Sequence, residues 1–151
     1  MFETMRILAL TIAAFAPLSL GNATCSMEIT GPHADPHVGE HISVELILRN
    51  TSDHPISPRG PNSNGVDTLY RYECRDGSGS SVRRAETGIL DSVGDVQVLA
   101  PGEDAKIQLS ITAACNLEKP GRYTVQLSRK FSYGKEDEIV RSNMLSITVL
   151  P

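Results

Sequence analysis

Short runs of alternating apolar and polar residues recur along most of this chain, each bounded by Gly, Pro, Asn, Asp or Ser. In the clearest run, His41–Leu48, every second residue from Ile42 onward is apolar. A period of two places successive side chains on opposite faces of a β-strand. No stretch keeps the 3.6-residue period of a helix long enough to predict one. The pattern therefore predicts an all-β fold.

Further runs supply the other expected strands. Alternation as clear as that of His41–Leu48 is found in Lys106–Ala113, Tyr123–Ser128 and Leu145–Leu150, and it is weaker in Met27–Thr30, Asp67–Arg75 and Asp95–Leu99. Val82–Ala85 is expected to pair with Tyr70–Cys74 across the glycine-rich turn at residues 76–79. Seven or eight short strands with frequent turns predict a two-sheet antiparallel sandwich of the immunoglobulin-like kind.

The N-terminal segment indicates export. Ile7–Leu20 is almost wholly apolar but shorter than the roughly 20 residues that cross a bilayer as a helix. Gly21-Asn22-Ala23 then offers small residues for a cleavage site. We expect a signal peptide over 1–23 and one domain over 24–151, exported to the periplasm or beyond. Translation starts at Met1 or at Met5, which would omit Glu3 and leave a more positive start.

The net charge, the hydropathy pattern and the residues before Cys25 argue against nucleic acid, a membrane span and a lipid anchor. The net charge is −4 and no basic cluster stands out in the sequence, which argues against nucleic acid as a partner. No second apolar segment is long enough to span a membrane. Cys25 does not fit a lipoprotein signal, because Thr24 and Asn22 stand where a small residue and a leucine are usual. We therefore expect no membrane span in the mature chain.

Three motifs resemble fibronectin type III and related immunoglobulin-like sandwiches. They are Leu99-Ala100-Pro101-Gly102-Glu103, the segment Leu117–Val125 with its Pro120-Gly121-Arg122-Tyr123, and Asn50-Thr51-Ser52 after an early strand. The resemblance implies a tyrosine corner, in which the Tyr123 ring enters the core and its hydroxyl bonds to nearby backbone. The chain has no tryptophan, so the Cys…Trp…Cys signature of antibody domains is absent.

The same outline also resembles a family of small bacterial proteinase inhibitors with an immunoglobulin-like fold. The matching elements are Asn50–Ser52, Tyr70–Asp76, Leu99–Glu103 and Pro120–Tyr123. The resemblance implies an exposed inhibitory loop, for which Arg59, Arg83 and Arg84 are the candidate residues.

Three cysteines in an oxidising compartment predict one disulfide. Cys74 and Cys115 both follow apolar residues on the inward phase of their expected strands, which favours a bond between them. Such a bond would stabilise the fold by about 4 kcal/mol in the chain-entropy model. Pairing of Cys25 with either of the other two and the absence of any intramolecular disulfide remain the alternatives. Otherwise Cys25 should be a reactive thiol near a frayed terminus.

The stretch Arg49–Gly65 is the longest irregular segment and carries three prolines, Pro55, Pro58 and Pro61. Long loops in compact domains often hold binding residues, although a plain surface connection is the alternative. The candidate binding residues of this loop are Arg49, Asp53, His54, Arg59, Asn62 and Asn64. Asn50-Thr51-Ser52 is formally a glycosylation acceptor, which we interpret as a turn.

Three histidines, His33, His37 and His41, recur at intervals of four residues. On a helix they would line one face and could bind zinc or copper, with Asp35 and Glu40 as further ligands. Pro36 and Gly39 argue against a helix, so solvated loop histidines are the favoured interpretation and no cofactor is expected. The acidic run Glu136-Asp137-Glu138 is expected at the tip of a solvated loop.

No catalytic residues are predicted. There is no G-x-S-x-G nucleophile motif, no G-x-G-x-x-G cofactor loop and no C-x-x-C redox motif. We therefore expect a non-enzymatic extracytoplasmic binding module whose partner is a protein or a cell-envelope ligand. The alternatives are a proteinase inhibitor and a periplasmic metal-binding protein.

Overall fold

The computed structural model describes residues 24–56, 70–84, 98–133 and 136–151. Seven strands and one short helix are found in them. Their bounds are β1 Cys25–Thr30, β2 Ser43–Asn50, β3 Arg71–Asp76, β4 Asp104–Ser110, α1 Ile111–Ala114, β5 Gly121–Tyr133, β6 Glu136–Arg141 and β7 Leu145–Val149. No helix of the described segments has the length and apolarity that a membrane crossing requires.

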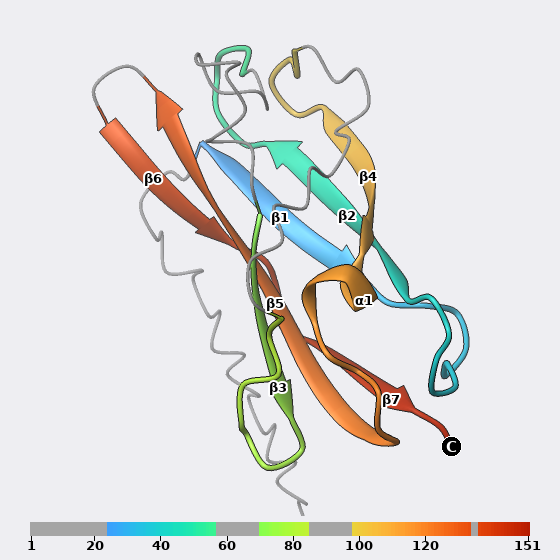
Figure 1. Cartoon of the computed structure of the whole chain (residues 1–151). Helices are drawn as coiled ribbons and strands as arrows, with labels where there is room; N and C mark the ends of the chain where they lie inside the picture. The colour runs from blue at the N-terminus through green and yellow to red at the C-terminus, as the bar shows by residue number, and fades with distance from the viewer. Residues whose placement is uncertain (1–23, 57–69, 85–97, 134–135) are drawn as a thin grey trace, which may run out of the picture.

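The strands form two antiparallel sheets that pack as two layers (Figure 1). One sheet has the order β1-β2-β4, and the other has the order β3-β5-β6 with β7 also paired to β5. The thirteen residues of β5 make this possible, because β6 pairs with the half near Tyr133 and β7 with the half near Gly121. The prediction of an all-β, two-sheet antiparallel fold is confirmed.

The core lies between the two sheets and follows the alternation along each strand. In β2, for example, Val44, Leu46 and Leu48 are buried, and in β5 Tyr123, Val125 and Leu127 are buried. The two sheets contribute one continuous cluster of buried side chains. Burial of this apolar surface is the main force that holds the two layers together.

The tyrosine corner implied by the resemblance is present. The Tyr123 ring is buried, and its hydroxyl donates a hydrogen bond of 2.8 Å to the carbonyl of Lys119.

The turn before β4 also forms where the sequence predicts it. Gly102 has a φ of +80°, and the Glu103 amide donates to the carbonyl of Ala100 at 3.0 Å.

The disulfide joins Cys74 of β3 to Cys115, with 6.0 Å between their Cα atoms, and it confirms the favoured pairing. Residues 81–84 form a short segment that lies beside the disulfide and is hydrogen-bonded to both sides of it. The Val82 amide donates to the carbonyl of Cys74 at 2.9 Å, and the Asn116 amide donates to the carbonyl of Val82 at 2.7 Å. Residues 81–84 therefore link the two cysteine-bearing segments by hydrogen bonds as well.

One predicted strand is shorter than expected. Lys106–Ala113 is strand only as far as Ser110, after which α1 forms a single helical turn. The Ser110 hydroxyl accepts a hydrogen bond from the Ala113 amide and caps this turn. Cys115 therefore reaches the core through a helical turn and not through strand alternation.

The acidic run was wrongly expected at a loop tip. Residues 136–138 belong to β6, which forms a hairpin with the far half of β5. Glu138 accepts a hydrogen bond of 3.0 Å from the backbone amide of Thr24. Cross-strand pairing with β5 outweighs the poor strand propensity of this run, which is why the local pattern is misleading.

Cys25 was also misjudged. It is fully buried at the start of β1, where it lies opposite Asn50 of β2, so it is not at a frayed end.

Several predictions fall outside the described residues and stay predictions. They concern the signal peptide over 1–23, the strand residues 67–69 and 95–97, Ala85, and the loop residues Arg59, Asn62 and Asn64.

Candidate functional site

The start of the predicted binding loop is a turn built around Asn50. This side chain is buried, and its amide nitrogen donates to the carbonyls of His54 at 2.8 Å and Leu99 at 2.9 Å. Its oxygen accepts from the backbone amide of Ser52 at 2.9 Å. An asparagine whose amide nitrogen is occupied in this way holds the loop together, as the interpretation of Asn50-Thr51-Ser52 as a turn requires.

Arg49 lies on the exposed face of β2 and forms an ion pair with Asp104 of the neighbouring strand β4. Its Nε and Nη2 donate to the two carboxylate oxygens of Asp104 at 2.6 and 2.8 Å. The hydrogen bonds from Arg49 are the largest cause of the lowered pKa of Asp104, and the same pair raises the pKa of Arg49. This bidentate pair joins β2 to β4 and gives Arg49 a structural role.

Asp53 and His54 form a local pair on the loop, with 3.0 Å between Oδ1 and Nδ1. The bond to His54 is the first cause of the lowered pKa of Asp53. The loop then closes through Ile56 and Leu99, whose backbones exchange hydrogen bonds of 2.9 and 2.8 Å. The described part of the predicted binding loop is thus occupied mainly by contacts within the fold.

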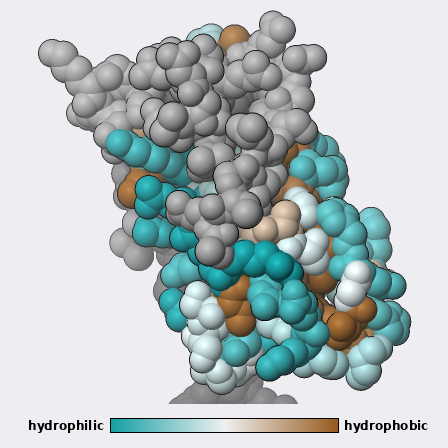
Figure 2. All heavy atoms as spheres, in the orientation of Figure 1, coloured by the Kyte–Doolittle hydropathy of each residue, from teal (hydrophilic) through white to brown (hydrophobic). Residues whose placement is uncertain are grey.

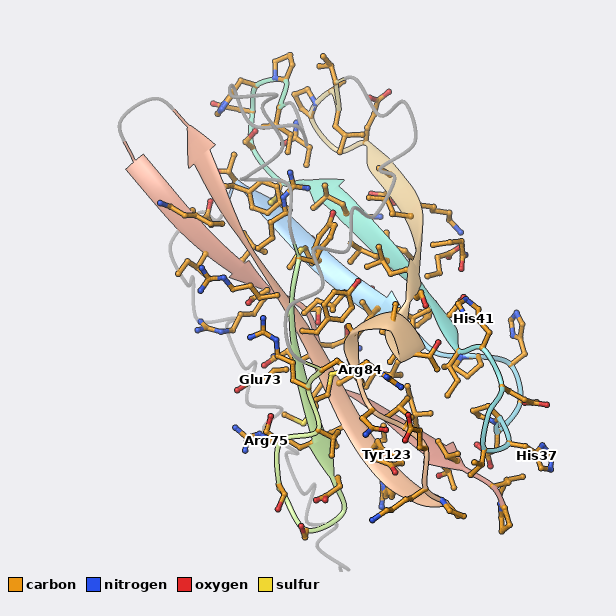
Figure 3. All side chains as sticks on the ribbon, viewed as in Figure 1. His37, His41, Glu73, Arg75, Arg84 and Tyr123 are labelled. Carbon is orange, nitrogen blue, oxygen red and sulfur yellow. A yellow bond between two sulfur atoms is a disulfide. The ribbon has the colours of Figure 1, made fainter. Side chains whose placement is uncertain are left out.

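The histidine segment is a loop, as the sequence favours. The His37 amide donates to the Glu40 carboxylate at 2.9 Å, and Gly39 has a φ of +86°. The His41 ring lies 3.3 Å from the hydroxyl of Thr112, away from His37 (Figure 3). Within the described segments, which include His33, the structure gathers no three His, Cys, Asp or Glu side chains able to hold a metal ion.

The candidate inhibitory residues Arg83 and Arg84 lie beside the disulfide. The Arg84 amide donates to the carbonyl of Ala114 at 2.8 Å, and its guanidinium donates to Glu118 at 3.0 Å. Arg83 forms an antiparallel bridge with Cys115. An inhibitory loop must present its backbone to a proteinase, whereas here much of the backbone is paired within the fold.

A different surface stands out once the strands are assembled. The outer face of the sheet of β3, β5, β6 and β7 gathers basic side chains, and we call it the cationic face. Figure 3 shows Arg75, with Glu73 beside it, pointing outward from β3 on the opposite side of the molecule from His37 and His41. The exposed basic residues of this face are Arg71, Arg75, Arg122, Lys130 and Arg141.

Strand pairing sets the spacing of these cations. Arg71, Ser128 and Arg141 occupy one row across three strands. Neighbouring strands lie about 4.8 Å apart, so the Cα atoms of Arg71 and Arg141 are about 10 Å apart. Arg122 and Lys130 lie toward the two ends of β5, about 27 Å apart at a rise of about 3.4 Å per residue. The cations therefore surround an elongated area.

The charge of this face opposes that of the chain. By strand register the outer phase carries five cations and two carboxylates, Glu73 and Asp137, which is opposite Ser132 of β5, so the cationic face has a net charge of +3, whereas the whole chain carries −4. Arg75 is ion-paired to Glu73 at 3.3 Å. Within the part of the chain that the structure describes, Arg71, Arg122 and Arg141 form no ion pair. Their positive charge is not cancelled locally.

The outer face of the other sheet is different in kind. There Arg49 pairs with Asp104, and Lys106 donates to Glu45 at 3.1 Å, so that cations and carboxylates alternate. The side of the molecule visible in Figure 2 is mainly hydrophilic, with small and separate hydrophobic areas among the described residues. The two outer faces thus differ in their exposed charge: cations are paired with carboxylates on one face and are in excess on the other.

The sequence-based analysis missed the cationic face. Its basic residues are at least four positions apart along each strand and come from three strands, so no linear cluster appears. One signal was available. Arg71 and Arg75, like Arg122 and Lys130, fall on the polar phase of alternating runs, which predicts a shared outer face once strand pairing is known.

No protein-family model matches this chain, and no curated protein matches it either.

Proposed function

We propose that this chain is a non-enzymatic extracytoplasmic binding module with an immunoglobulin-like fold, and that it binds an acidic partner through the cationic face. The two antiparallel sheets, the tyrosine corner at Tyr123 and the disulfide support a rigid sandwich suited to display a surface. The predicted signal peptide and the disulfide agree with an oxidising location outside the cytoplasm.

The observation that carries the proposal is the segregation of charge. Surface cations are usually interspersed with carboxylates, as on the outer face of the β1-β2-β4 sheet. Concentrating +3 on one face of a chain of net −4 raises the desolvation and self-repulsion cost of that face. A complementary anionic partner would relieve this repulsion and would be steered toward the face.

The polar side chains of the predicted binding loop are already used to hold the fold together, which makes the cationic face the better candidate for binding. Arg49, Asp53 and His54 are engaged in pairs that hold the loop and the β2–β4 sheet together. Arg71, Arg122 and Arg141 have no such structural duty in the described segments. Side chains that do not stabilise the fold are the ones available to bind a partner.

The proposal is tested by retention on immobilised cell-envelope material from the organism that encodes the chain. The test variant combines Arg71→Gln with Arg141→Gln, which removes both ends of one row. The matched control combines Arg49→Gln with Lys106→Gln on the opposite sheet, so that the net charge falls equally. Loss of retention in the test variant alone supports the proposal. Equal retention of both variants, or no retention of the unmodified protein, contradicts it.

A further inference from the structure

We infer that the cationic face binds a linear acidic polysaccharide, a chain of sugars that bears repeated carboxylate or sulfate groups. This inference rests on the proposed function and names the partner of the same surface. It is drawn from the chemistry between the cations, from the shape of the area and from the side chains that the area lacks.

The middle of the cationic face is composed of hydroxyl and amide side chains. Thr124, Gln126 and Ser128 lie along β5 on the outer phase, and Ser146 of β7 is directly opposite Thr124. The Gln126 nitrogen donates to the carbonyl of Ser142 at 2.9 Å, so its oxygen and the hydroxyl groups of the neighbouring side chains are the atoms that can bond the hydroxyl groups of a sugar chain. The surrounding cations suit its acidic groups.

The arrangement of the cations is elongated and two-sided. Arg71 and Arg75 flank β5 on the β3 side, and Arg141 flanks it on the β6 side. Arg122 and Lys130 lie toward the ends of β5, about 27 Å apart. A linear polymer that follows β5 would meet cations on both sides and at both ends, whereas a single small anion would meet only one or two of them.

The side chains absent from the face disfavour other acidic partners. Single-stranded nucleic acid is usually held by aromatic rings on which the bases stack. Every aromatic side chain whose exposure the structure describes is buried: Tyr70, Tyr72, Tyr123 and Phe131. Protein interfaces usually have an apolar centre. Here the apolar Ile139 lies beside Lys130 toward one end of the face, and the centre is polar.

The experiment measures binding of the full mature protein to defined polymers by calorimetry at low and moderate salt. The probes are alginate as a polyuronate, dextran sulfate, uncharged dextran, poly-glutamate, single-stranded DNA and vesicles of phosphatidylglycerol. We expect alginate or dextran sulfate to bind with an affinity that falls as salt rises, because binding releases counterions. Uncharged dextran and poly-glutamate should bind at least about tenfold more weakly, because dextran has no acidic groups and poly-glutamate has no sugar hydroxyl groups.

The Arg71→Gln, Arg141→Gln variant should lose about tenfold or more in affinity for the acidic polysaccharide. The Arg49→Gln, Lys106→Gln control should stay within about twofold, and melting curves verify that both variants fold. If the double variant is unfolded, Arg122→Gln serves in its place. Equal losses in the test and control variants would overturn the inference.

The outcomes separate this inference from the proposed function. If poly-glutamate, DNA or vesicles bind as tightly as the polysaccharides, the inference fails and an acidic partner of another class remains. The inference also fails, while the proposed function stands, if no probe binds but envelope retention still depends on Arg71 and Arg141. If neither probes nor envelope material bind, both fail.

Discussion

The side chain of Asn143 forms two hydrogen bonds with the backbone of Ile29, its oxygen accepting from the amide at 2.7 Å and its nitrogen donating to the carbonyl at 3.0 Å. Ile29 lies in β1, at the edge of one sheet, and Asn143 lies between β6 and β7 of the other. The asparagine amide therefore imitates the pairing of a neighbouring strand and joins the two sheets at one edge.

Replacing Asn143 with alanine should lower the free energy of unfolding by about 1–3 kcal/mol, because two partly buried backbone groups of Ile29 lose their partner. Asn116→Ala is the matched control. Among the described residues, the exposed Asn116 side chain only accepts a hydrogen bond from the nearby Glu118 amide at 3.3 Å. Urea unfolding measures both changes. Equal changes in the two variants would show that the link between the sheets carries no particular stability.

Loss of the disulfide should destabilise the fold much more. Cys115→Ser should lower the unfolding free energy by about 4 kcal/mol in the chain-entropy model, because the bond closes a long loop between residues 41 positions apart. Urea unfolding of the variant against the unmodified protein measures this. A loss of less than about 1 kcal/mol would mean that hydrogen bonding around residues 81–84 already holds the segments together.

Thiol labelling tests the buried position of Cys25. In the native protein a thiol reagent should label no cysteine, because Cys25 is fully buried and the other two form the disulfide. After unfolding without reduction, one cysteine should be labelled, and peptide mapping should place the label on Cys25. Rapid labelling of Cys25 under native conditions would contradict its place in β1.

Arg129 is a buried cation on the inward phase of β5. Its guanidinium lies 5.1 Å from the ring centroid of Tyr70 and 4.8 Å from that of Phe131, and Nη1 donates to the Tyr70 hydroxyl at 3.2 Å. Arg129→Ala should lower the unfolding free energy by about 3 kcal/mol through a cavity and lost cation–π contacts. Arg141→Ala, an outward residue of β6, should change it by less than about 0.5 kcal/mol. Similar melting temperatures for the two variants would rule out a stabilising role for Arg129.

Acid should weaken the fold through the three aspartates whose pKa is lowered, Asp53 beside His54, Asp76 and Asp104. Hydrogen bonds from Ser78 and Ser80 lower the pKa of Asp76, and hydrogen bonds from Arg49 lower that of Asp104. A carboxyl whose pKa is depressed on folding adds stability above its unfolded pKa, and this stability is lost as the pH falls through the folded pKa. The melting temperature should therefore decline below about pH 4.

The variant Asp104→Asn should show a smaller decline, because one of the three aspartates with a lowered pKa is gone. Asp35→Asn, in an exposed part of the loop before β2, is the control and should follow the unmodified protein. Parallel acid profiles for Asp104→Asn and the unmodified protein would mean that the pair with Arg49 does not contribute to acid sensitivity.

Local patterns predicted the parts of the fold that local chemistry determines. The predicted strand Leu145–Leu150 is observed as Leu145–Val149, one residue shorter, and the inward phase of Cys74 led to the correct disulfide. The turn at Gly102 also follows from residues close in sequence. In these places the propensity of the residues and the final structure agree, so short-range reasoning is sufficient.

Elements that depend on long-range pairing were missed. β5 continues past Ser128, where it pairs with β6 and where Arg129 contacts two aromatic rings in the core, and no local pattern reveals these partners. The acidic β6 exists because β5 pairs with it. For the same reason the cationic face was invisible in the sequence: Arg71 and Arg141 become neighbours only through β5, which lies between them.

The charge separation described above also makes the molecule an electric dipole. The basic pole is the outer face of β3, β5 and β6, and the compensating negative charge is spread over the rest of a chain of net −4. Near an anionic surface, such a dipole experiences a torque as well as a force. The molecule would rotate its basic pole toward the surface before contact, so that most productive encounters begin already oriented. Its rate of association should therefore depend more steeply on ionic strength than its small net charge suggests.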